Sequence, residues 1–483
     1  MEEGLRACPC RVGVSAQSLS RWLSPLPWSP LGFGVAQASD FDKAEKPLNV
    51  DTPSFFMTVE ESQHIASQLE PISLRLKLKK SPHPAVAEWV QPIFPDDPFM
   101  KDDAWKYVRK GYKQGQIIRK RKSLWSQLFF PGSRSVQYAF VSYDSRGYPM
   151  TATATLVVPL HAKENAGVVQ YNQFINSSGP RCKVTNSLNS PLAGGDFNNV
   201  IQGLNIVLAA GHPVLFPDAE GPRNSYAINR LASHVLLDSM RMVHRQKDFP
   251  LKSSPFTAIG ISHGGMQTGY AAAEQPYYAP DLTKYIKQFI VNEGAPDLIK
   301  VAHNFGFFGS RQNIPALYGS FMMSFVIGAM REYSDVVPNA EKWLTDYGKS
   351  IITVNRNLCM PFTFPMGTGM ISSKVMKDGF FESETFRQAM QVAKESSSIY
   401  YPGHPKVPTL LIHGALDEIL FQAEQDAVLW HRYCDAGSNM LFQLTPVGHF
   451  GTPALSMPRM LIQGMAPFHG AEQHPNCDIP VLL

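Results

Sequence analysis

The chain has 483 residues, of which 44% are hydrophobic and 17% are charged. This composition is apolar enough to bury a large core and excludes a mainly disordered chain. The formal net charge of +4 is small for this length and gives no reason to expect nucleic acid as a partner. The length exceeds the usual range of a single domain, so it favours one large domain with insertions or a cap over several equal domains.

Residues 1–39 have mixed features of a targeting segment. Arg11 and Arg21 precede an apolar stretch that ends in the small-residue sequence Ala36-Gln37-Ala38. Prolines interrupt that stretch and disfavour the helix that a signal peptide forms (Pro25, Pro27, Pro30). We therefore interpret this segment as a leader that is either targeting or disordered.

The six cysteines are widely spaced and match no metal-binding pattern. Two lie in the leader (Cys8, Cys10) and four in the body of the chain (Cys182, Cys359, Cys434, Cys477). An even number of scattered cysteines suits two disulfides in an oxidising compartment, and four buried free thiols are the alternative. The cysteines thus favour a secreted or otherwise exported protein.

The segment that follows the leader is proline-rich and irregular up to about residue 130. Within it, residues 74–80 alternate apolar and basic side chains, which predicts an edge strand with one solvent-exposed face. The basic run 119–122 is expected to be solvated surface rather than a binding patch.

From residue 136 the sequence is typical of an α/β protein. Segments 136–143 and 151–158 predict a β-hairpin. Short apolar strands then alternate with helices: the strands are 167–171, 213–216, 256–261, 289–291, 408–412 and 440–444, and the helices include 196–210, 229–245 and 263–274. This order predicts a mostly parallel sheet covered by helices on both faces.

An insertion of roughly 100 residues separates the strands at 289 and 408. An insertion this long is usually a cap or lid over an active site. Its apolar run 318–330 is too short to span a bilayer and predicts a buried helix. Its methionine and phenylalanine side chains are expected in the cap core, on a substrate surface, or in both places (Phe305, Phe307, Phe308, Met322, Met323, Phe325). We divide the chain into the leader, a first core part with its extension (40–300), the helical cap (301–400) and a second core part (401–483).

The sharpest local pattern is Gly260-Ile261-Ser262-His263-Gly264, which follows an apolar strand and precedes a helix of small residues. It matches the G-x-S-x-G nucleophile elbow, in which a serine lies on an abrupt turn from strand to helix. Side chains two residues to either side would collide, and glycine removes that collision. We predict Ser262 as the nucleophile of an α/β-hydrolase core, with Gly260 and Gly264 as the elbow glycines. The alternative is a turn with no catalytic role.

A serine hydroxyl needs a base, usually a histidine oriented by a carboxylate, and in α/β-hydrolases the acid and then the histidine follow the serine. Asp417 follows the predicted strand 408–412 and is our choice of acid, with Glu418 as its rival. His449 follows the strand 440–444 and is our choice of base. Its rivals are His413, His469, His474 and His263.

The oxyanion of the tetrahedral intermediate needs hydrogen-bond donors. The backbone N–H of His263, directly after the nucleophile, is one candidate. The second candidate is a donor of the loop that follows the strand at 167–171, at or near Asn176. Residues 176–178 also spell a glycosylation sequon, but a glycan is not expected on a loop that lines the site.

Several motifs resemble the secretory lipase family, the lipase A type of yeasts and other fungi. The similarity covers most of residues 95–465. The motifs are 97–99 (DPF), 115–119 (GQIIR), 211–222 (GHPVLFPDAEGP), Tyr226, 235–241 (VLLDSMR), the elbow, 413–418 (HGALDE), 434–437 (CDAG) and 448–449 (GH). The chain departs from the family where Asn176 stands in place of a common Asp and Ala219 in place of Tyr.

The resemblance implies a secreted lipase or esterase with a helical lid that needs no metal or organic cofactor. It also implies disulfides joining Cys182 to Cys359 and Cys434 to Cys477. The expected partners are a small-molecule or lipid ester and, through the cap, transient contact with a lipid interface, with no nucleic acid and no transmembrane segment. An acyltransferase that uses the same site, and a non-catalytic scaffold that binds lipid or a partner, are the alternative functions.

Overall fold

The computed structural model describes residues 47–70, 90–91, 97–123, 125–174, 177–189, 203–334, 340–359 and 363–482. These residues all belong to the unit Pro47–Leu483. The predicted leader, the predicted strand at 74–80 and Asn176 lie outside the described residues. None of the described helices is long and apolar enough to cross a membrane.

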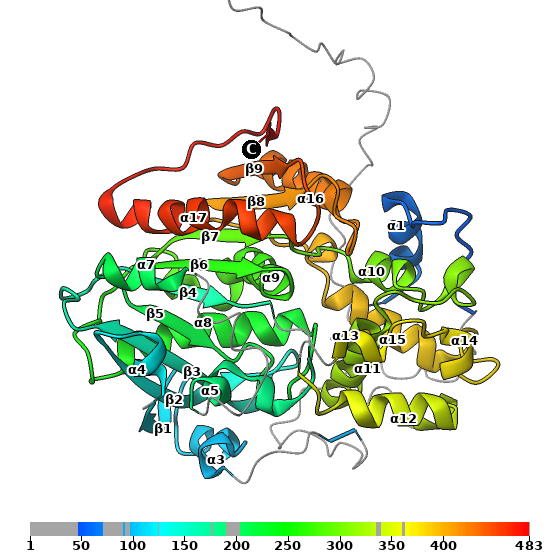
Figure 1. The fold of residues 1–483 in the computed structure, drawn as a ribbon, viewed down its shortest axis with the longest axis horizontal. Coiled ribbons are helices and arrows are strands. Elements are labelled where there is room, and N and C mark those ends of the chain that lie inside the picture. The colour runs from blue at the N-terminus through cyan, green and yellow to red at the C-terminus, as the bar shows by residue number, and fades with distance from the viewer. Residues whose placement is uncertain are drawn as a thin grey trace, which may run out of the picture. The chain divides into compact units, whose positions relative to one another are not determined.

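A ten-stranded sheet forms the core, with the strand order β1-β2-β3-β5-β4-β6-β7-β8-β9-β10 (Figure 1). Its strands are β1 Ile117–Lys122, β2 Ser133–Tyr143, β3 Pro149–Pro159, β4 Val168–Asn172, β5 Val214–Pro217, β6 Phe256–Ile261, β7 Ile286–Asn292, β8 Thr409–Gly414, β9 Met440–Thr445 and β10 Val481–Leu482. Strands β4 to β10 pair in parallel, and β1 to β3 form an antiparallel edge. The predicted mostly parallel sheet is confirmed.

Helices cover both faces of this sheet because the side chains of each central strand alternate between two cores. In β6, Phe256 and Ala258 pack in the core that contains α8 (Asn229–Arg245) and α9 (His263–Tyr278). Ile259 and Ile261 pack on the opposite side, with α7 (Leu204–Ala209) and α17 (Gly451–Met465). The remaining helices of the core are α3 Ala104–Val108, α4 Ser126–Phe129, α5 Val184–Ser187 and α16 Ala423–Asp435.

The predicted insertion is helical and lies between β7 and β8. It contains α10 Leu298–Asn304, α11 Gly319–Glu332, α12 Asp346–Asn355, α13 Thr363–Met366, α14 Ser372–Val375 and α15 Glu384–Glu395. These helices lie together beside the sheet (Figure 1). The N-terminal helix α1 (Val59–Ser67) packs against α10 and α15, so part of the N-terminal extension joins the insertion.

The structure adds two strands that the sequence patterns did not indicate. The basic run, expected as solvated surface, forms the edge strand β1, where Arg119 lies 2.7 Å from Asp103 and Arg121 lies 2.7 Å from Asp97. At the opposite edge, β10 pairs with β9. Both are edge strands with a single neighbour, so their exposed or charged side chains give no apolar alternation to recognise.

Candidate active site

Ser262 lies at the turn between β6 and α9, as the elbow pattern predicts. Its backbone has φ 53° and ψ −115°, a region that non-glycine residues rarely adopt. The N–H of Ser262 donates to the carbonyl of Asn292 on the neighbouring strand β7, at 2.8 Å. Strained backbone of this kind is typical of functional sites, because the surrounding structure must hold it in place.

The elbow glycines are needed because backbone passes very close to them. A Cβ atom on Gly260 would lie 2.1 Å from the carbonyl oxygen of Gly264, and one on Gly264 would lie 2.0 Å from that of Asn172 on β4. Gly265, to which the sequence reasoning gave no role, is also tight: its Cβ would lie 2.6 Å from the carbonyl oxygen of Asn292. The tight turn therefore depends on three glycines, because a side chain at any of them would collide with backbone atoms that cannot move aside.

His449 lies in the loop between β9 and α17. Its Nε2 is 3.0 Å from Oγ of Ser262, within hydrogen-bond distance. Its backbone N–H donates to Oε2 of Glu418 at 2.8 Å. Glu418, the rival candidate for the acid, thus contacts the main chain of His449 and orients the loop rather than the ring.

Asp417 lies in the loop after β8, with Oδ1 3.2 Å from Nδ1 of His449. The same oxygen accepts the backbone N–H groups of Ile419 and Leu420, each at 3.0 Å. Burial alone would raise the pKa of Asp417, but hydrogen bonds and charge from His413 and His449 hold it well below its usual range. The carboxyl group is therefore ionised and fixed beside the imidazole.

The rival histidines lie elsewhere. His413 is buried on the far side of Asp417, with Nε2 2.9 Å from its Oδ2. The side chain of His263 leaves the site: its Nε2 accepts the N–H of Ala227 at 3.1 Å, and its ring packs against Tyr226. The other two candidates lie in the C-terminal segment, where His469 approaches His212 at 3.4 Å and His474 is exposed. Among these five histidines, His449 is the one in contact with Ser262.

A second carboxylate, which the sequence reasoning missed, lies beside His449, the predicted base. Glu293 directly follows β7, and its Oε2 is 3.4 Å from Nδ1 of His449. Its position after a parallel strand was the available signal, because the carboxyl ends of parallel strands meet at one edge of the sheet. Burial lowers the pKa of His449, but hydrogen bonds and charge from Asp417 and Glu293 outweigh burial and raise it to about 9.

Glu293, Asp417 and His449 also form a group whose donor atoms lie within 4.8 Å of one another, close enough to hold a metal ion. A metal on Nδ1 would displace the N–H that a carboxylate uses to orient a histidine base. Because Nε2 of His449 already contacts Ser262, we interpret the group as the acid–base side of a serine nucleophile.

One of the two predicted oxyanion donors can be placed. His263 is the first residue of α9, so its backbone N–H lies at a helix N-terminus next to Ser262, where the helix dipole favours negative charge. Asn176 lies outside the described residues. The residues that follow it, Ser177 and Ser178, are buried, and the carbonyl of Ser178 accepts a hydrogen bond from Arg331 of α11 at 2.7 Å.

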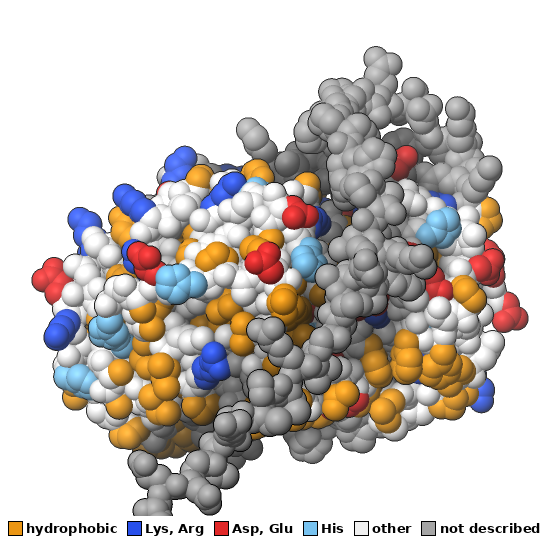
Figure 2. All heavy atoms as spheres, turned by 90° about the horizontal axis from the view of Figure 1, so that it is seen from above, with side chains coloured by type: hydrophobic (Ala, Val, Ile, Leu, Met, Phe, Trp, Pro, Cys, Tyr) orange, Lys and Arg blue, Asp and Glu red, His pale blue; other side chains and the backbone are white. Residues whose placement is uncertain are grey.

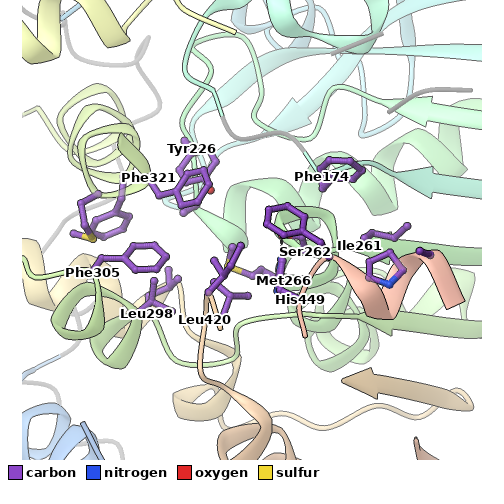
Figure 3. A pocket seen from close by; sticks show the side chains of 18 of the residues that line it. Phe174, Tyr226, Ile261, Ser262, Met266, Leu298, Phe305, Phe321, Leu420 and His449 are labelled. Carbon is purple, nitrogen blue, oxygen red and sulfur yellow. Dashed lines mark hydrogen bonds between the residues drawn. The ribbon is translucent and has the colours of Figure 1, made fainter. Parts of the chain in front are cut away.

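A cavity of about 340 Å³ opens beside Ser262. Its lining is mostly apolar and comes from the core and from the helical insertion (Figure 3). Ser262 and His449 lie at one side of it, and Leu298, Phe305 and Phe321 lie at the side away from them. Of the six insertion side chains singled out in the sequence, Phe305, Met322 and Phe325 line the cavity, whereas Phe307, Phe308 and Met323 are buried in the core that includes the insertion.

The structure joins Cys182 to Cys359 and Cys434 to Cys477, the pairs that the resemblance implied. Cys182 lies in the short helix Pro180–Cys182 after the loop that contains Ser178, and Cys359 follows α12 of the insertion. Cys434 lies at the end of α16, and Cys477 lies in the C-terminal segment before β10. The first bridge therefore ties the insertion to the loop beside the elbow.

We expect removal of the first bridge to destabilise the protein more than removal of the second. The first bridge closes a separation of 177 residues and the second one of 43. A longer loop removes more entropy from the unfolded chain, so the first bridge should stabilise the folded state by about 1 kcal/mol more than the second. Thermal unfolding of the paired variants C182A/C359A and C434A/C477A measures this difference. An equal loss of Tm, or a larger loss for the second pair, would contradict the expectation.

The open, mostly parallel sheet with an elbow serine at its carboxyl edge defines the fold as that of an α/β-hydrolase. Candida antarctica lipase A in its closed state has a similar structure, with a TM-score of 0.68 and 19% identity over 80% of this chain and 89% of that chain. A mutant of the rice cell wall degrading esterase LipA from Xanthomonas oryzae is a more distant structural neighbour, with a TM-score of 0.57 and 13% identity over 74% of this chain and 99% of that chain.

The secretory lipase family profile matches residues 200–471, which is more than half of the chain. The chain therefore belongs to the secretory lipase family. A secreted triacylglycerol lipase of Malassezia restricta is 27% identical over 70% of this chain and 73% of its own length. Lipase 2 of Candida albicans is 26% identical over 68% of this chain and 71% of its own length.

Proposed function

We propose that this protein is an exported lipase that hydrolyses fatty acyl esters through an acyl-enzyme on Ser262. The observation that carries the proposal is the alignment of Ser262, His449 and Asp417 at the opening of an apolar cavity. Ester hydrolysis agrees with membership of the secretory lipase family. Export agrees with the secreted relatives and with two disulfides, which persist in oxidising compartments.

The geometry supports a two-step reaction. Oγ of Ser262 attacks the ester carbonyl carbon while Nε2 of His449 takes the hydroxyl proton. The proton then passes to the departing alkoxide, which leaves as an alcohol and leaves the acyl group on Ser262. A water molecule, deprotonated by His449, attacks the acyl carbonyl and releases the carboxylic acid. Asp417 holds the Nδ1–H of His449 throughout, and the N–H of His263 stabilises the oxyanion.

The apolar cavity favours a fatty acyl chain as the group transferred to Ser262. Its volume of about 340 Å³ lies within the range of small-ligand sites and suits one acyl chain. Helices α10 and α11 supply its far side through Leu298, Phe305 and Phe321. We infer that the insertion is the cap of this enzyme and that opening it admits the substrate.

Contact with a lipid surface is supported by exposed hydrophobic side chains near the site. Phe450, next to the base, is 60% exposed and also lines the cavity. Leu416, beside the acid, is 68% exposed, and Leu455 of α17 is 61% exposed. Figure 2 shows one face of the molecule, on which hydrophobic side chains gather in groups between scattered charged ones. Large apolar residues exposed around a site favour association with an apolar phase.

The proposal is tested by hydrolysis of p-nitrophenyl esters from acetate to palmitate, with and without an emulsified interface. We expect kcat/KM to rise with chain length until the cavity is filled, because each buried methylene contributes roughly 0.8 kcal/mol. We also expect activity to rise when an interface is added. A wild-type protein that is folded but hydrolyses none of these esters would contradict the proposal.

Leu298→Trp should shorten the cavity and change the chain-length preference. Leu298 is 5% exposed at the side of the cavity away from Ser262, so the larger indole ring of tryptophan there takes the space of the distal acyl carbons. We expect kcat/KM for palmitate to fall by about tenfold or more while acetate changes little. Leu317→Trp, at a 58% exposed position of the same insertion, is the matched control. An equal loss on both esters would mean that this cavity does not bind the acyl chain.

A further inference from the structure

Glu293 is held rigidly at the edge of the sheet where the site opens. Its backbone has φ 50°, and its N–H donates to the carbonyl of Ile412 on β8 at 2.9 Å. Its Oε1 accepts the N–H of Gly414 at 2.7 Å. This bond fixes the carboxylate so that its other oxygen, Oε2, lies 3.4 Å from Nδ1 of His449. The side chain is fully buried, so water does not screen its charge from the imidazole.

A buried histidine offsets the charge of this second carboxylate. Nε2 of His413 lies 2.9 Å from Oδ2 of Asp417 and 3.4 Å from Oε2 of Glu293. Its Nδ1 lies 2.7 Å from Oδ2 of Asp426 on α16. Burial lowers the pKa of His413, but Glu293, Asp417 and Asp426 raise it well above its usual value. This arrangement favours a protonated His413, which offsets the repulsion among the three carboxylates around it.

We propose that Glu293 is a second positioning carboxylate for the base, acting together with Asp417 through its charge beside Nδ1 of His449. The inference rests on the proposed function, since it concerns the activation of Ser262. The two acceptors come from successive parallel strands, Glu293 after β7 and Asp417 after β8, and they approach the same nitrogen at 3.4 and 3.2 Å. His413 lies within ion-pair distance of both acids and offsets the repulsion between the two buried charges.

Two consequences distinguish this arrangement from a single-acid site. The first is a base that stays protonated to a higher pH, because a second negative charge stabilises the imidazolium. The second is redundancy, because Glu293 can still hold the correct tautomer of His449 when Asp417 is neutralised. Two further titratable groups face this cluster: Glu418, bonded to the backbone of His449, and Tyr318 of the insertion, whose pKa is raised by burial and by Glu418 and Asp417.

The first test is the pH dependence of labelling by a fluorophosphonate, which reacts with an activated serine whatever the natural ester. Labelling requires neutral His449, so the rate should rise as pH increases through the pKa of His449, about 9 in the wild type. Glu293→Gln removes the charge but keeps an oxygen for Gly414, so we expect the rise to move to lower pH by about one unit. Glu424→Gln, a neutralised glutamate whose side chain is 59% exposed, is the matched control and should not move it.

The second test is a double-mutant cycle with the same probe and with p-nitrophenyl butyrate. Loss of the single acid in a serine protease site costs about 10⁴-fold in kcat. We expect Asp417→Asn alone to cost only about 10²-fold, and Asp417→Asn combined with Glu293→Gln to approach the 10⁴-fold loss. The two substitutions should therefore be strongly non-additive, because both neutralise a carboxylate that lies beside the same imidazole nitrogen.

Several outcomes would overturn the inference. An unchanged pH profile in Glu293→Gln would do so, and so would Asp417→Asn losing as much activity as the double variant. If Glu293→Gln does not fold, Glu293→Asp is the second variant. Its shorter side chain keeps the negative charge but places it farther from Nδ1 of His449, so the same shift of the labelling profile to lower pH is expected. A wild-type protein that neither reacts with the fluorophosphonate nor hydrolyses any ester would overturn the proposed function, and this inference with it.

Discussion

Ser262→Ala is expected to reduce kcat/KM on p-nitrophenyl butyrate by about 10⁵-fold or more. Removing the nucleophile of a serine hydrolase abolishes the acyl-enzyme route and leaves only the rate enhancement from the oxyanion donors and binding. The lost oxygen is the atom that lies 3.0 Å from Nε2 of His449. Initial rates of ester hydrolysis, with an active-site titration by a fluorophosphonate, measure the loss.

The same substitution should leave the fold intact, because alanine differs from serine only in the hydroxyl group. The backbone strain at φ 53° remains in the variant, so no stabilisation through a relaxed turn is expected. Thermal unfolding of wild type and variant provides the control, and their Tm values should agree within a few degrees. Activity that survives in a folded Ser262→Ala variant would show that another residue is the nucleophile.

Arg331→Met is expected to destabilise the protein by roughly 3–5 kcal/mol, because it leaves several buried backbone carbonyls without their hydrogen-bond donor. The guanidinium is fully buried in α11 and donates to backbone carbonyls of separate segments. Nη1 donates to Ser178, Arg223 and Asn224 at 2.7–3.0 Å, Nε to Val90 at 3.0 Å, and Nη2 to Arg356 at 3.2 Å. Methionine fills similar space but leaves these carbonyls without their donor.

Denaturant unfolding measures the expected loss for Arg331→Met. Arg331→Lys should be intermediate, because an ammonium group keeps the charge but cannot reproduce the planar fork of donors. Arg181→Met, at an exposed arginine near the same loop, is the matched control and should change stability by less than about 0.5 kcal/mol. A loss for Arg331→Met as small as the control's would mean that water or other donors replace the guanidinium.

The positions of the central strands and of the elbow could be predicted from the sequence alone. The strand β6 and the helix α8 have the bounds that the apolar patterns indicated, Phe256–Ile261 and Asn229–Arg245. Local chemistry is sufficient there, because a mainly apolar strand and an amphipathic helix each show the hydrophobic pattern of their own secondary structure. The glycines of the elbow could also be predicted from the sequence, because a side chain at either position would collide with backbone near Ser262.

Candidate acid and base residues could be proposed because topology brings loops together. Loops after parallel strands share one edge of the sheet, so Asp417 after β8 and His449 after β9 were expected near Ser262, and the structure brings the three together. The same rule applied to Glu293 after β7, but the sequence does not indicate which side chains of a loop point toward the site. Only the positive φ at Glu293 and its bond to Gly414 direct its carboxylate to His449.

The sequence by itself determined the α/β order of the elements, the elbow and a short set of candidate site residues, because these depend on neighbours a few positions apart. The tertiary structure decided the rest: that Arg331 holds the carbonyl of Ser178, that α1 packs against α10 and α15, and that β10 extends the sheet beside β9. Each of these contacts joins segments tens to hundreds of residues apart. Their partners are chosen by packing and by the satisfaction of buried polar groups, which leave no periodic trace in the local sequence.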